Sequence, residues 1–445
     1  MTTKHKIFPN GLKLVYEHNS NNITSLNIVV NVGSKNENSE LHGASHFIEH
    51  MLFKGTTNLP ETKMISSIFD KIGAFINAHT FINYTCYVSK FESGYFNTCF
   101  NTLVDMLLHS RFEREDFDLE KNVIVEEIKR QMDNTEAFIN TKIYDVMFNN
   151  TDIGKSIGGS PDTVLSLEYE AVLNYYKHYY KPSNMVVSIC SNLSFEEIIT
   201  NINKSDLINL KTIATTYTYE PNYIVKKSNI RNIRLFDRNL EQIHLALGFK
   251  VCDMYNKDKY SLDILRIILS GNMSSILFSS LREENGLTYN ISIDNTLFKE
   301  YGIFAIITSV DRNKLLNFKD AGTANKGALE IIISELNKII QNGINEEQLN
   351  IAKGYLKGVL TLSLEDSSSI TEFNGMNVLY NFQEKEISLQ NLYESVYESI
   401  TLENINSVIK KYISRDNIYS YYVGPKEYIT NDDISEIIKI ENTLY

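Results

Sequence analysis

The segment from Gly43 to Thr56, GASHFIEHMLFKGT, carries two histidines and a glutamate at spacings that suit metal chemistry. His46 and His50 are four residues apart (50 − 46 = 4), so on an α-helix both imidazoles project from one face and can bind the same ion. Glu49 lies near that face, within reach of a metal-bound water. Such a set of side chains can activate water for hydrolysis.

A catalytic zinc ion needs three protein ligands and one open position, and this segment supplies two ligands. The helix-like segment from Asp116 to Met132 offers Glu120 and Glu127, which are seven residues apart (127 − 120 = 7) and therefore share one helical face. The order His-x-x-Glu-His is that of the inverted zinc-peptidase motif. Taken alone, two helical histidines can equally be surface or core residues, and glutamates on a helix are usually solvated.

Length and composition exclude several classes of protein. The chain has 445 residues, which predicts two or three domains, and a net charge of −12, which argues against nucleic-acid binding. No apolar run approaches the roughly 18 residues of a membrane span, so no membrane partner is expected. Four scattered cysteines form no CxxC pair, which disfavours a disulfide framework or a thiolate metal site. No leader-like segment is visible, and a cytoplasmic location is expected.

The two halves of the chain resemble each other. Residues 166–168 and 401–403 each open a helix-like segment that is followed by a strand, and their offset of 235 (401 − 166) is close to half the chain. A repeat of this length indicates duplicated domains. The polar segment 211–233 is the expected linker, which places an N-terminal domain at 1–210 and a C-terminal domain at 234–445.

Individual elements follow from hydrophobic periodicity. Alternating apolar residues predict strands at Ile7–Val15 and Phe75–Thr80, and a helical period predicts a long helix at Glu346–Ser363. Because each half mixes such strands and helices, the predicted class is α+β, with a sheet covered by helices in each domain.

The metal segment and its surroundings resemble the pitrilysin-type (inverzincin, M16) zinc metallopeptidases. Glu127 follows His50 by 77 residues (127 − 50 = 77), as in that family. The similarity is greatest to the branch of the mitochondrial processing peptidase β subunit and its bacterial relatives. The segment 73–80, GAFINAHT, is similar to the family's substrate-binding strand, and 281–289, LREENGLTY, to the Arg-x6-Tyr segment of its second domain.

The resemblance implies two tandem homologous α/β-sandwich domains that form a clamshell around a peptide chamber. It also implies one Zn²⁺ per chain, bound by the N-terminal domain through His46, His50 and Glu127. Glu49 is then the catalytic base. Glu120 is implied as a supporting residue outside the ligand set that orients a ligand histidine.

Further residues are implied to contact the substrate. Asn77 and Ala78 are expected to pair with the substrate backbone by strand addition, and His79 to touch the substrate beside them. Arg282 and Tyr289, from the C-terminal domain, are expected to complete the active site as catalytic donors when the two domains close.

The expected function is that of a zinc metalloendopeptidase that hydrolyses peptide bonds in extended or unfolded peptides. The alternative is a catalytically silent subunit that binds peptides or scaffolds a complex like the processing peptidase. Silent relatives usually lack a ligand or the base, whereas all of these residues are present here. Peptide is the expected partner, and a homodimer or heterodimer stays open.

Overall fold

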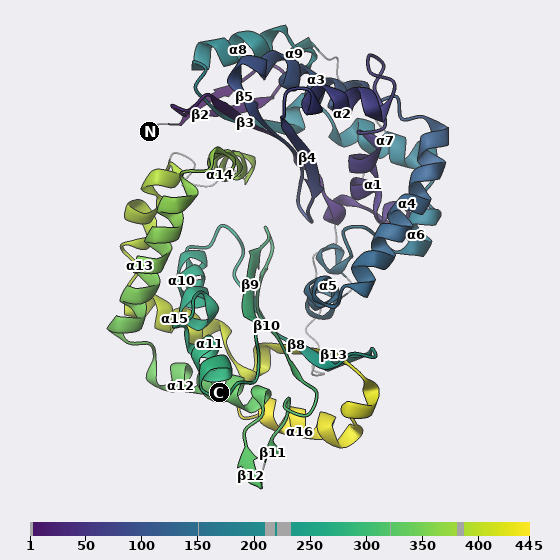
Figure 1. Ribbon diagram of the computed structural model, residues 1–445. Helices are drawn as coiled ribbons and strands as arrows, with labels where there is room; N and C mark the ends of the chain where they lie inside the picture. Colours follow the sequence, from purple (N-terminus) through teal and green to yellow (C-terminus); the bar gives the residue numbers. More distant parts are fainter. Residues whose placement is uncertain (1–2, 150, 210–218, 220–232, 321, 381–386) are drawn as a thin grey trace. The chain divides into compact units, whose positions relative to one another are not determined.

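The computed structural model describes residues 3–149, 151–209, 219, 233–320, 322–380 and 387–445, which group into two compact units (Figure 1). Unit 1 comprises residues 1–131, 151–223 and 360–392, and unit 2 comprises 132–150, 224–359 and 393–445. Each unit combines a sheet with helices, which confirms the predicted α+β class. The predicted linker lies outside the described residues except for Tyr219 and Ile233. The linear domain boundaries and the clamshell arrangement stay predictions.

The sheet of unit 1 has six strands in the order β1-β2-β6-β3-β5-β4. The strands are β1 (Lys4–Ile7), β2 (Lys13–His18), β3 (Ile23–Val30), β4 (Phe75–Thr80), β5 (Thr85–Glu92) and β6 (Met185–Ser191). Strand β4 has the predicted bounds and lies at one end of the order, where β5 is its one strand partner among the described residues. The predicted strand Ile7–Val15 is wrong, because the chain turns between β1 and β2, where Gly11 has a φ of 85°.

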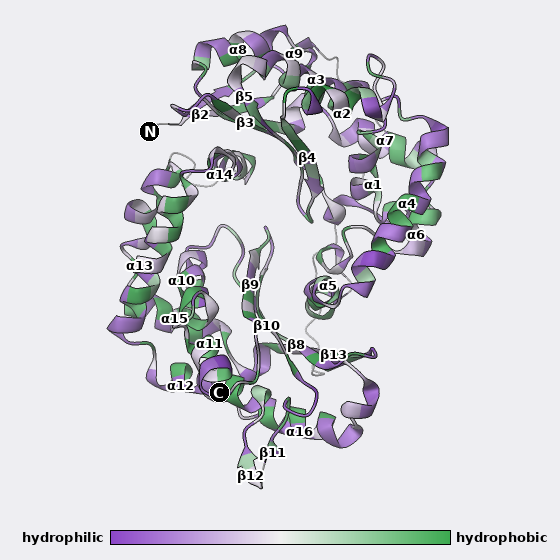
Figure 2. Cartoon of the chain, viewed as in Figure 1, coloured by the Kyte–Doolittle hydropathy of each residue, from purple (hydrophilic) through white to green (hydrophobic). Residues whose placement is uncertain are grey.

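The helices of unit 1 include the two that carry the candidate ligands. They are α1 (Ala44–Met51), α2 (Thr62–Asp70), α3 (Phe96–His109), α4 (Arg114–Asp133), α6 (Pro161–Leu165), α7 (Tyr169–Tyr179), α8 (Phe195–Lys204), α9 (Asp206–Asn209) and α14 (Ser367–Tyr380). Strand β3 includes hydrophobic stretches, coloured green in Figure 2, and residues 24–30 of it are buried. None of the described helices is both long and apolar enough to cross a membrane.

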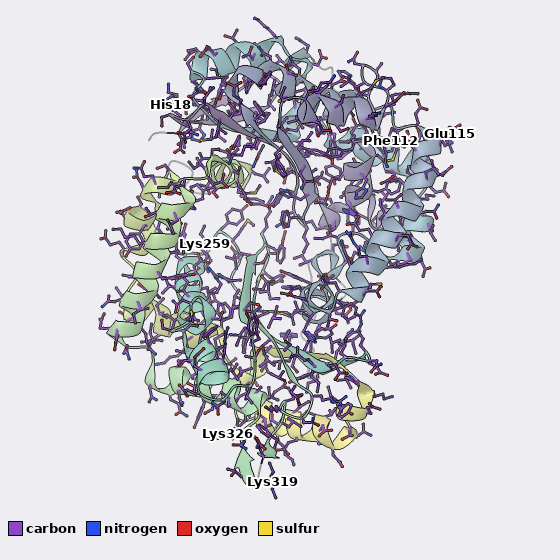
Figure 3. All side chains as sticks on the ribbon, viewed as in Figure 1. His18, Phe112, Glu115, Lys259, Lys319 and Lys326 are labelled. Atoms are coloured by element: carbon purple, nitrogen blue, oxygen red, sulfur yellow. The ribbon has the colours of Figure 1, made fainter. Side chains whose placement is uncertain are left out.

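The main sheet of unit 2 has five strands in the order β7-β13-β8-β10-β9. The strands are β7 (Ile233–Asp237), β8 (Gln242–Val251), β9 (Ile291–Leu297), β10 (Gly302–Asp311) and β13 (Ile418–Gly424). The helices are α5 (Thr135–Met147), α10 (Asp258–Ser270), α11 (Ile276–Phe278), α12 (Ala328–Asn342), α13 (Glu346–Ser363), α15 (Leu402–Tyr412) and α16 (Asn431–Glu441). A hairpin of β11 (Phe318–Asp320) and β12 (Thr323–Asn325) carries Lys319, and Lys326 follows it (Figure 3).

The two sheets share one topology. Apart from the additional strand β1, the order β2-β6-β3-β5-β4 corresponds to β7-β13-β8-β10-β9. In both sheets the first two strands of this order pair in parallel and the others are antiparallel. This common order is the structural counterpart of the repeat seen in the sequence.

In each unit, one helix that packs on the sheet comes from the other half of the sequence. Helix α5 packs on β8 and β13 with apolar side chains such as Phe138 and Ile143, which are buried. Helix α14 packs on β2, β3 and β6, where its contacts are largely polar (Figure 1). Asn374 of α14 donates to the buried Glu17 carboxylate at 2.8 Å. Sequence periodicity cannot predict this exchange, because it reports which face of a helix is buried but not by which sheet.

Candidate metal centre

Helix α1 is fixed at its first residue by a glycine and a buried carboxylate. Gly43 precedes the helix with a φ of 100°, a conformation that favours glycine. Glu37 accepts hydrogen bonds from the backbone N–H groups of Gly43 and Ser45, both at 2.7 Å. These bonds satisfy donors that the start of a helix otherwise leaves unpaired. The orientation of the following turn, which carries His46, is thereby set.

The structure brings the three predicted ligands together. Phe47 and Met51 of α1 are fully buried, and His46 and His50 lie side by side on the neighbouring face with ring centroids 4.6 Å apart. Glu127 of α4 places its Oε2 atom 3.4 Å from His50 Nε2 and 4.0 Å from His46 Nε2. One ligand atom of each of the three lies within 4.8 Å of the others.

These donors fit a zinc ion in chemistry and in spacing. Zinc binds imidazole nitrogen and carboxylate oxygen at about 2.0–2.2 Å in a tetrahedron, which separates neighbouring donors by about 3.4 Å. Two imidazoles and one carboxylate leave a fourth position for water or substrate. Across the described ranges, no other group of three such side chains lies close enough to share an ion, in either unit.

Glu120 contacts one of the ligand histidines. Its Oε1 atom lies 2.8 Å from His50 Nδ1, and its side chain is only 3% exposed. Its other oxygen forms an ion pair with Lys54. A carboxylate on the outer nitrogen of a ligand histidine fixes the ring and raises its basicity, as the resemblance implies for Glu120. Sequence reasoning missed Lys54, although it follows His50 by only four residues (54 − 50 = 4).

The charges of these side chains follow from their contacts. Burial, with the neighbouring His50, lowers the pKa of His46 to about 4. Burial also disfavours protonation of His50, but its bonds to Glu120 and Glu127 outweigh this and raise its pKa to about 9. The bond to His50 lowers the pKa of Glu127 to about 2. At neutral pH the carboxylate of Glu127 is therefore charged and available to bind a cation.

The start of α4 is anchored by an aromatic residue with an unusual backbone. Phe112, two residues before the helix, has a φ of 48° and is buried (Figure 3). Its ring stacks on Tyr176 with centroids 5.5 Å apart. Phe117 and Ile124 then bury the adjoining face of α4. This packing fixes the rotation of the helix that presents Glu120 and Glu127 to α1.

Glu49 lies beside the histidines with its side chain turned inward. The residue is 8% exposed, and its Oε2 atom accepts a hydrogen bond from the Thr80 hydroxyl at 2.5 Å. Burial raises the pKa of Glu49. Sequence reasoning did not single out Thr80. The one sequence feature that points to it is strand alternation, which places Thr80 on the same face of the strand as Ala78.

The residues expected to contact substrate lie on the edge strand β4. Asn77, Ala78 and His79 are consecutive there, and the Asn77 side chain accepts the Ala78 N–H at 2.9 Å. His79 packs edge-on against Phe81, with ring centroids 5.1 Å apart. Burial lowers the pKa of His79, so it is neutral at neutral pH. None of these contacts joins His79 to the predicted metal ligands.

Arg282 and Tyr289 lie together in unit 2. Arg282 belongs to the π-helical turn η6 (Ser279–Glu283) and donates to the backbone carbonyl of Tyr289 at 3.1 Å. Its guanidinium also lies 4.7 Å from the centroid of the Tyr289 ring. Tyr289 is 80% exposed.

Comparisons with known proteins agree with the motif. Residues 13–160 match the family described as "Insulinase (Peptidase family M16)", and residues 166–356 match the "Peptidase M16 inactive domain". The "Uncharacterized zinc protease YmxG" of Bacillus subtilis is 30% identical over 92% of this chain and 95% of its own length. The chain belongs to peptidase family M16.

Other M16 relatives and solved structures extend this result. An uncharacterized zinc protease of Rickettsia felis is 32% identical over 83% of this chain and 85% of its own. A crystal structure of a protease from Helicobacter pylori matches with a TM-score of 0.84 at 20% identity, over 95% of this chain and 99% of that one. It therefore shares the two-domain fold of this M16 chain. The suggested closeness to the processing peptidase β subunit stays a prediction.

Proposed function

We propose that the chain is a zinc-dependent endopeptidase that cleaves extended or unfolded peptides. The single observation that carries the proposal is the group of His46, His50 and Glu127 with the buried Glu49 beside it. A two-histidine, one-carboxylate set with an adjacent glutamate is the arrangement of catalytic zinc sites in peptidases. The relatives named zinc proteases support the same assignment.

Each side chain of the site has a defined task in this proposal. His46, His50 and Glu127 would hold the ion, which when bound supplies a polarised carbonyl and an acidified water. Glu120 keeps the His50 ring in its ligand orientation. The carboxylate of Glu49 takes a proton from the attacking water and passes it to the leaving amine nitrogen, so one water is consumed for each peptide bond that breaks. Burial, which raises the pKa of Glu49, suits this exchange.

The edge of unit 1 can bind an extended peptide as an additional strand. Within the described ranges β4 has β5 as its one neighbouring strand, so its other edge can offer backbone donors and acceptors to an added strand. The N–H of Ala78 is bonded by the Asn77 side chain, and a substrate carbonyl would replace that oxygen. Because such pairing forms hydrogen bonds to exposed backbone groups of the substrate, it favours extended peptides over folded proteins.

We include Arg282 and Tyr289 in the proposal as donors to the oxygen that becomes negative during the reaction. Replacing Tyr289 with phenylalanine removes one hydroxyl and keeps the ring beside Arg282. Loss of one such donor lowers kcat by about 100- to 1,000-fold. A Tyr289→Phe variant with unchanged kcat would remove this residue from the mechanism.

The experiment that tests the proposed function compares wild type with Glu49→Gln on a quenched peptide library. Zinc content is measured on the same samples. We expect one zinc per chain in both proteins, cleavage by wild type and a loss of about 100- to 10,000-fold in the variant. Equal inertness of two fully zinc-loaded proteins would instead support the silent, peptide-binding subunit. Sequencing the products then defines the cleavage preference.

A further inference from the structure

The two faces of β4 have different neighbours. Side chains alternate along a strand, so Ala78 and Thr80 share one face, and both are buried, at 8% and 9% exposure. This inner face lies against helix α1. Asn77 and His79 point to the opposite face. The strand that is proposed to pair with the peptide therefore also contacts the helix that carries Glu49.

The contact between Thr80 and Glu49 is the one that links the strand to the base. The Thr80 Oγ1 donates to Glu49 Oε2 at 2.5 Å, and both residues are buried. Within the part of the chain that the structure describes, no other side chain hydrogen-bonds the Glu49 carboxylate. This bond holds one carboxylate oxygen in place and leaves the second oxygen to receive a proton.

Thr80 is itself held in place by the sheet. It pairs with Thr85 of β5 as the last residue pair of the β4–β5 ladder. Its side chain, branched at Cβ, has few rotamers, so its hydroxyl position follows the backbone of β4. Any shift of β4 on binding a peptide is thereby transmitted to the Glu49 carboxylate.

We propose that Thr80 is a positioning residue that sets the orientation of Glu49 relative to the peptide bound on β4. The inference rests on the proposed function, since it concerns the base of that reaction. Without the hydroxyl, the Glu49 Oε2 atom loses its partner in a buried setting, and the carboxylate reorients toward other donors. A displacement of about 1 Å in a catalytic group lowers the rate by about 100-fold.

The test uses full-length, zinc-loaded protein with three substitutions. Thr80→Val keeps the branched shape and removes the hydroxyl, and Thr80→Ser restores a hydroxyl. Thr85→Val is the matched control, because Thr85 is also buried, pairs with Thr80, and donates to the Val32 carbonyl at 2.9 Å rather than to Glu49. For each protein kcat, KM, zinc affinity by chelator competition and the thermal midpoint are measured.

We expect Thr80→Val to lower kcat by about 10- to 100-fold with little change in KM or zinc affinity. Thr80→Ser is expected to recover most of kcat. Thr85→Val is expected to lower the thermal midpoint, since the Val32 carbonyl loses its donor, but to keep kcat.

Three results would overturn the inference. They are full kcat in Thr80→Val, no recovery in Thr80→Ser, or a parallel loss of kcat and thermal midpoint in the Thr80 and Thr85 variants, which would indicate a purely structural role. A wild type that binds zinc and cleaves no peptide would overturn the proposed function and this inference together. An active wild type with an equally active Thr80→Val variant would overturn the inference alone.

Discussion

The structure predicts different consequences for two substitutions that remove the same charge from the same helix. Glu127→Gln and Glu120→Gln each replace a carboxylate with an amide on α4 and near His50. Glu127 lies 3.4 Å from the outward Nε2 atom of His50, on the side shared with His46. Glu120 instead lies 2.8 Å from Nδ1, the nitrogen on the other side of the ring. Only Glu127 can be a ligand.

The magnitudes follow from these positions. Zinc binding to a four-ligand protein site is worth about 10–16 kcal/mol, or about 2.5–4 kcal/mol per ligand. Loss of the Glu127 ligand is therefore expected to weaken zinc binding by roughly 100- to 1,000-fold. Loss of a carboxylate that only orients a ligand histidine weakens it by about 10- to 100-fold. Both variants lose one negative charge near the ion, so the ratio of their zinc affinities reports the effect of losing a ligand.

The assay is competition for zinc between each purified variant and a chromophoric chelator at neutral pH. We expect Glu127→Gln to release zinc at a chelator concentration about tenfold lower than Glu120→Gln does. Equal retention by the two variants, or weaker binding in Glu120→Gln, would refute the assignment of Glu127 as the ligand and Glu120 as its neighbour.

Three further predictions concern the metal, a buried contact and pH. Removal of zinc with a chelator should abolish peptide cleavage, and added zinc should restore it in proportion to the zinc bound; cleavage that persists in metal-free protein would contradict the site. Asn374→Ala should lower the calorimetric midpoint of unfolding, because the buried Glu17 carboxylate loses a partner worth about 1–3 kcal/mol, and an unchanged midpoint would count against this contact. Burial lowers the pKa of the Lys250 ammonium group from 10.5 to about 8. Because the unfolded chain binds the Lys250 proton more tightly than the folded chain does, the stability of wild type is expected to rise as the pH rises from 8 to 10.5. Lys250→Met should raise the thermal midpoint at neutral pH, and the difference in midpoint between the variant and wild type should shrink between pH 8 and 10.5. A difference that does not change with pH would refute burial of the charged Lys250 as its cause.

Some features of this protein follow from the sequence because their cause is local. The spacing of His46 and His50 places both imidazoles on one face of whatever helix forms there. Apolar alternation defined β4, and a helical period defined α13, both with the bounds found in the structure. Motif order over most of the chain indicated family M16 before any fold was known. The sequence also narrowed the third ligand to two glutamates on one helical face.

Other features depend on contacts between residues that are distant in sequence, which periodicity does not record. Only the folded chain brings Glu127 to the Nε2 atom of His50 and Glu120 to its Nδ1 atom, because this depends on how α4 is rotated against α1. The partnership of Thr80 with Glu49 likewise requires that β4 lie against α1. Helices α5 and α14 pack on sheets formed by the opposite halves of the sequence. Local sequence patterns determine which face of a helix or strand is apolar, whereas tertiary packing determines which of these faces contact each other.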